Sequence, residues 1–162
     1  LYLIQFETYI LEGHNKNLPT HYLEKAEENI RISIAIYEKW LARTKHLSEK
    51  EFEQLVKQTF PENEPLFHDR NLAKLRAKRI ADLITAKQET ARRLSVSLTN
   101  LGVILRYRND LEGAKHQYEK AIALWDLNYT AKDNLDVLMG RKPQKRPLIT
   151  KLFPPDKDEN GK

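Results

Sequence analysis

The sequence lacks cysteine altogether, and its 162 residues include only five glycines, seven prolines and one methionine. The absence of cysteine excludes disulfide bonds and cysteine-ligated metal sites, although it fits either redox compartment. No apolar run is long enough to cross a bilayer. Hydrophobic residues make up 40% and charged residues 31% of the chain. This balance suits a soluble helical protein, and the length suits one domain with a real core.

Sequence motifs for catalysis are also lacking. The chain has no phosphate-binding glycine loop, no Gly-x-Ser-x-Gly motif and no nucleophilic cysteine. We therefore expect no enzymatic activity, no catalytic residue, no bound metal and no cofactor. The histidines are scattered and do not have the short spacing of metal ligands; they are His14, His21, His46, His68 and His116.

The chain begins with Leu1 rather than methionine, which indicates a processed form or an excised fragment. A signal or an anchor upstream of this residue remains open. The compartment is therefore unknown, with the cytoplasm slightly favoured.

Two short helices are expected in residues 1–60. Leu1–Glu12 has apolar residues near helical spacing, and Gly13 ends it. Ser48 and Glu51 have the spacing of a capping box, which opens another helix ending near Thr59. We expect this helix to bury Phe52, Leu55 and Val56.

A longer helix is expected between them, opening at Pro19-Thr20. Its apolar residues recur every three or four positions as far as Leu41. The four isoleucines from Ile30 to Ile36 alternate, which is typical of a strand, but the helical flanks favour a helix. Apolar residues on several faces predict that this helix is buried more deeply than most.

The segment 69–107 contains no proline and one glycine, Gly102. Its apolar residues keep helical spacing throughout, which predicts one long helix. The alternative is two helices that meet around Gln88–Arg93. We favour the single helix because no helix-breaking residue is present.

Two further helices and a tail complete the chain. The helices are expected at Leu111–Leu127 and Thr130–Met139, with Gly140 as the terminal cap. The tail contains four prolines, several basic residues and an apolar cluster that could dock in its own chain or a neighbour. The expected organisation is one all-α domain with an N-terminal helical region (1–60), a central part (61–140) and this tail (141–162).

The clearest pattern lies between Leu98 and Asp126. Gly102 and Ala114 are small enough to let two antiparallel helices cross closely, and Leu98 and Tyr118 fill the wider parts of the contact. These spacings resemble the helix-turn-helix of a tetratricopeptide repeat (TPR). The matching residues are Leu98, Leu101, Gly102, Leu105, Ala114, Tyr118 and Ala121.

The resemblance covers one complete repeat, about residues 95–128, and a partial one at residues 129–140 that has no second helix. Asn109-Asp110 replaces the family's Gly-Asp in the turn, and Asp126 replaces its closing proline. A free-standing array usually needs three repeats. Residues 1–60 would therefore serve as a cap or as a degenerate repeat, unless a second copy completes the stack.

In this family the first helices of successive repeats line a concave groove. The resemblance implies a scaffold or adaptor that binds a peptide or a partner protein there. Asn100 and Asn134 fall where family members hydrogen-bond a peptide backbone, which suits an amide that both donates and accepts. The implied groove residues are Val96, Thr99, Asn100, Val103, Arg106, Tyr107, Thr130, Asp133 and Asn134, followed by Val137.

Two other functions remain open. The net charge of +5 is concentrated in residues 70–93 and after Gly140, which suits a basic helical module that binds nucleic acid or an anionic surface. No aromatic platform or known nucleic-acid motif accompanies this charge. The apolar stripe from Ile80 to Leu105 would instead suit a self-assembly domain of a larger protein, such as a homodimer.

Overall fold

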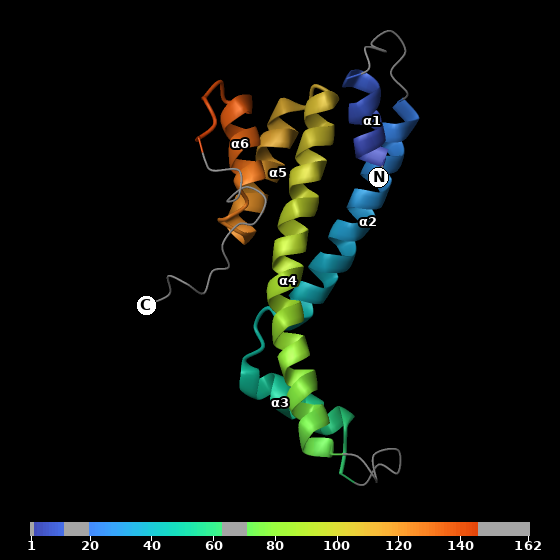
Figure 1. Cartoon of the computed structure of the whole chain (residues 1–162), viewed down its shortest axis with the longest axis vertical. Helices are drawn as coiled ribbons and strands as arrows, with labels where there is room; N and C mark the ends of the chain where they lie inside the picture. Colours follow the sequence, from blue (N-terminus) through green and yellow to red (C-terminus); the bar gives the residue numbers. More distant parts are fainter. Residues whose placement is uncertain (1, 12–19, 63–70, 146–162) are drawn as a thin grey trace. The chain divides into compact units, whose positions relative to one another are not determined.

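The computed structural model describes residues 2–11, 20–62 and 71–145, and all regular structure in these ranges is helical (Figure 1). The expected all-α fold is therefore confirmed. The expectations for the tail beyond residue 145 and for the loops at 12–19 and 63–70 lie outside the described residues. The helices are α1 (Tyr2–Leu11), α2 (Thr20–Thr44), α3 (Glu49–Thr59), α4 (Leu72–Tyr107), α5 (Leu111–Leu124) and α6 (Tyr129–Leu138).

The chain divides into two compact units, which are described separately. One unit comprises residues 1–36 with the chain from Arg92 onwards, and the other comprises residues 37–91. Helices α2 and α4 each contribute a segment to both units. Because α4 is one helix from Leu72 to Tyr107, the expected long helix is confirmed and the alternative break around Gln88–Arg93 is wrong.

The unit of residues 37–91 contains the whole of α3, with the adjoining segments of α2 and α4. The capping box of α3 is formed as predicted: the Ser48 N–H donates to Glu51 Oε2 at 2.7 Å, and the Ser48 hydroxyl oxygen accepts from the Glu51 N–H at 3.3 Å. The Ser48 hydroxyl also donates to Glu51 Oε2 at 2.6 Å. This hydrogen bond first, and then the one from the Ser48 N–H, lowers the pKa of the Glu51 carboxyl. Phe52 and Val56 are buried, but Leu55 is 47% exposed, because so short a helix buries only one narrow side.

The predicted deep burial of α2 is wrong. Ile34 is buried, but Ile32 and Ile36 are 53% and 60% exposed. A helix turns by 100° per residue, so residues 32 and 36 share one face, while Leu23, Ala26 and Ile30 share another. Only the second face packs against the buried Ile104 of α4.

The unit that begins at residue 1 has two neighbouring clusters in its core. Leu23 and Ala26 of α2 pack with Ile104 of α4 in the first. The second joins α4, α5 and α6 through Val103, Ala114 and Tyr118, with Leu135 and Leu138 packed against it. Leu3 of α1 packs against both clusters. Figure 1 shows α1 beside α2, and α5 between α4 and α6.

The turn between α4 and α5 uses two residues with specialised roles. Asn109 has φ 62°, the left-handed conformation that asparagine tolerates better than most residues other than glycine. Asp110 caps α5, since its Oδ1 accepts from the Gly113 N–H at 2.9 Å. Helix α5 ends at Leu124, three residues earlier than expected, while Gly140 follows α6 with φ 71° as predicted.

Candidate partner-binding cavities

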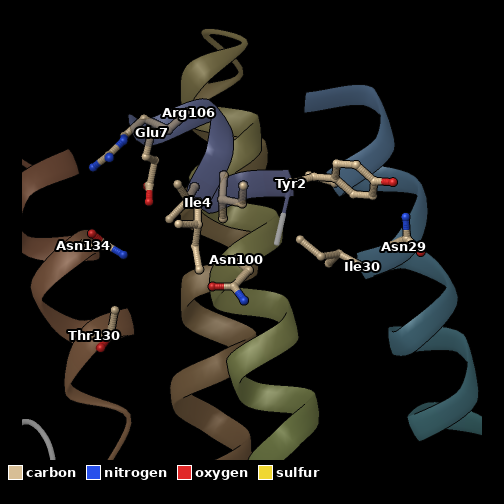
Figure 2. A pocket seen from close by; sticks show the side chains of 12 residues that line it. Tyr2, Ile4, Glu7, Asn29, Ile30, Asn100, Arg106, Thr130 and Asn134 are labelled. Carbon is tan, nitrogen blue, oxygen red and sulfur yellow. The ribbon is translucent and has the colours of Figure 1, made fainter. Parts of the chain in front are cut away.

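Helices α1, α2, α4 and α6 surround a cavity of about 520 Å³ (Figure 2). Ten residues were predicted to line a groove, and this cavity brings five of them together from α4 and α6. They are Asn100, Val103, Arg106, Thr130 and Asn134.

Three asparagines line this cavity, and they differ in whether their side-chain amides form hydrogen bonds within the protein. Figure 2 shows Asn100 of α4 and Asn134 of α6 both pointing into the space between these helices. Neither side-chain amide has a hydrogen-bond partner among the described residues. The Asn29 amide, from α2, instead donates to the Lys25 carbonyl at 2.8 Å. Two of the three amides therefore keep their donors and acceptor available inside the cavity.

Sequence reasoning missed the wall that α1 contributes to this cavity. Tyr2, Ile4 and Glu7 line it, and Figure 2 shows Ile4 and Glu7 directed towards Asn100 and Asn134. The helical spacing of α1 was visible in the sequence. The position at which α1 packs was not visible, because residues about one hundred positions apart in the sequence must come into contact. The sequence of one short helix does not specify which distant residues it will contact.

A second cavity, of about 300 Å³, lies beside the first and shares Asn100 and Thr130 with it. Its walls include Val96, Leu127 and two aromatic residues, Trp125 and Tyr129. The Arg92 guanidinium lies over the Trp125 ring, 4.8 Å from its centroid, as a cation–π pair. We call the surface lined by the two cavities the binding groove.

The floor of the second cavity is a buried hydrogen-bond network centred on Asn128, the cap of α6. Its amide donates to the hydroxyl oxygens of Ser95 (2.8 Å) and Thr99 (2.9 Å), and its Oδ1 accepts from the Ala131 N–H at 3.0 Å. The Ser95 hydroxyl donates to the Ala121 carbonyl at 2.7 Å, and that of Thr99 donates to the Ser95 carbonyl at 2.9 Å. The network ties α4 to the junction of α5 and α6.

The other predicted groove residues lie in different surroundings. Val96 lines the second cavity and is 44% exposed. Thr99 also lines it, but is buried and uses its hydroxyl within the network. Tyr107 and Asp133 line neither cavity, and Val137, also outside both, is exposed.

The residues predicted to pack the repeat are mostly buried. Leu98, Leu101, Gly102, Ala114, Tyr118 and Ala121 are buried, and Leu105 is half-buried. The Tyr118 hydroxyl has no hydrogen-bond partner within the described residues. Burial raises the pKa of Tyr118, an effect that Arg106 partly opposes.

Several cations of the basic run at residues 70–93 are engaged inside their own unit. The Arg76 guanidinium donates to the Phe60 carbonyl at 2.6 Å, and the Lys87 ammonium donates to the Leu47 carbonyl at 2.8 Å. Arg92 lies over Trp125. Less of the positive charge is therefore presented to an anionic partner than the sequence alone indicates.

Comparison of the chain with protein-family models, curated proteins and solved structures gave no match. Within the described residues, three or more potential metal ligands do not gather at any point. In the same part of the chain, no helix combines the length and the apolar character needed to span a membrane. The geometry of the binding groove therefore carries the functional conclusion.

Proposed function

We propose that this protein is a TPR-like interaction module that binds an extended peptide segment of a partner protein in the binding groove. The observation that carries the proposal is the pair of amides at Asn100 and Asn134, which face one cavity without an internal hydrogen-bond partner among the described residues. A peptide backbone presents a donor and an acceptor at each residue, and a side-chain amide can satisfy both.

The apolar part of the cavity supports the same kind of ligand. Val103, Leu3 and Ile30 lie beside the two amides, so a bound segment would bury side chains while its backbone pairs with asparagine. The spacing of 34 residues between Asn100 and Asn134 matches the length of a TPR, which is the basis for proposing this mode of binding. Binding would rest on preorganised contacts and would involve no chemical step.

The test is the affinity of peptides selected from a random twelve-residue library against the full chain. The double substitution Asn100→Ala and Asn134→Ala should weaken binding roughly 10- to 100-fold, since each amide contributes about 0.5–1.5 kcal/mol through each hydrogen bond. Fluorescence polarisation with labelled peptides measures the change.

The matched control is Asn29→Ala, which removes an amide from the same cavity that already donates to the Lys25 carbonyl. It should change affinity less than about threefold. Melting curves of both variants check that the fold is retained. Equal affinities for the wild type and the Asn100/Asn134 variant would contradict the proposal.

A further inference from the structure

We infer that the two cavities have different tasks: the first holds the backbone of the peptide, and the second takes one large apolar side chain. This inference rests on the proposed function and adds the chemical class of the ligand.

The polar groups of the two cavities differ in how far they are already satisfied. In the second cavity, Asn128 and Thr99 hydrogen-bond each other and Ser95. A polar side chain entering there would lose its water and gain no bond from these groups. Asn100 lines both cavities and Asn134 lines the first alone, and neither amide has such a partner among the described residues. Backbone recognition therefore belongs to the first cavity, where both of these amides lie.

The second cavity has an apolar wall. Val96 is 44% exposed, and Trp125, Leu127 and Tyr129 are half-buried around the same space. Aromatic and aliphatic walls of this kind, enclosing about 300 Å³ here, accept an anchor such as phenylalanine, leucine or methionine.

The two cavities are continuous. Asn100 and Thr130 line both of them, so one extended segment can pass from the first to the second without leaving the surface. The occupant is therefore a single peptide with a backbone-binding part and an anchor residue.

The experiment uses Trp125 as a reporter. The sequence has two tryptophans, so Trp40→Phe leaves Trp125 as the only indole. Trp40 belongs to the unit of residues 37–91, whereas the residues that line the two cavities belong to the other unit. A peptide selected against the full chain is titrated into this variant, beside a copy in which its largest apolar residue is alanine.

We expect the parent peptide to change the emission of Trp125 at saturation, and the alanine copy to bind at least about tenfold more weakly. Val96→Asp, which places a carboxylate at the cavity, should reduce the affinity for the parent peptide about tenfold. Val137→Asp, an exposed position of α6 that lines neither cavity, is the matched control and should leave the affinity unchanged.

Three results would overturn the inference. Peptides that bind without changing Trp125 emission, and equally well with alanine at the anchor, would leave the proposed function intact and remove the anchor site. Binding that emerges only after removal of residues 146–162 would assign the groove to that segment of the chain. Failure to select any peptide would overturn the proposed function, and the inference with it.

Discussion

Gly102→Leu should destabilise the chain by about 3 kcal/mol, the upper end of the usual cost of overpacking. A Cβ atom at Gly102 would lie 2.5 Å from Cε1 and 2.8 Å from Cδ1 of the Tyr118 ring. Tyr118 is fully buried between α4 and α6, so the ring has no open space into which it can move. Chemical denaturation followed by circular dichroism measures the loss.

A substitution at the partner residue separates this clash from other effects. Gly102→Ala alone should also destabilise, because its Cβ meets the same ring atoms. In a Tyr118→Leu background, which lacks Cε1 and Cζ, the same change should become neutral or stabilising by about 0.5–1 kcal/mol, the helix preference of alanine over glycine. Ala123→Leu, at an exposed position of α5, is the control and should change stability little. A Gly102→Ala cost that persists unchanged in the Tyr118→Leu background would contradict this account of the crossing.

Asn128→Ala is expected to cost about 3 kcal/mol of folding free energy, because it removes a helix cap and two buried hydrogen bonds together. The Ala131 N–H would lose its acceptor inside the core, and the hydroxyls of Ser95 and Thr99 would each lose a donor. Thermal and denaturant unfolding measure this change.

Asn71→Ala is the matched control for the loss at Asn128. Its Oδ1 accepts from the Lys74 N–H at 3.0 Å, the same capping bond, but Asn71 is exposed and belongs to no buried network among the described residues. It should cost about 1 kcal/mol. Equal costs for the two substitutions would show that the buried network contributes nothing beyond the cap.

The elements that sequence reasoning predicted correctly are those specified by local chemistry. Ser48 and Glu51 specify the start of α3, and a long stretch without proline specifies α4. Gly102 and Ala114 predicted a close crossing of two helices because neither side chain holds the backbones apart. Such signals need no knowledge of distant parts of the chain.

The features that were missed depend on contacts between distant segments. Asn128 looks like an ordinary loop residue, and only the return of α6 to α4 shows that its amide meets Ser95 and Thr99. The exposure of Ile32 and Ile36 follows from which face of α2 meets its neighbours, which their alternating spacing does not specify.

One wall of the second cavity, made by Trp125, Leu127 and Tyr129, was missed for the same reason. Val96 and Trp125 lie 29 positions apart, and Trp125 was expected inside a helix rather than at its end, as the cap of α5. A helix ending at Leu124 turns the chain so that Leu127 and Tyr129 join the same wall. An error of three residues in the predicted end of α5 therefore hid this wall of the cavity from sequence reasoning.

The most direct test of the central claim is to follow the side-chain amides of asparagine by nuclear magnetic resonance while a selected peptide is added to ¹⁵N-labelled chain. Asn100 and Asn134 are assigned through their alanine variants. We expect both amide signals to shift in proportion to occupancy, while the signal of Asn71, which caps α4 and lines neither cavity, stays nearly constant. Saturating peptide that leaves the Asn100 and Asn134 signals unmoved would contradict backbone recognition by these amides.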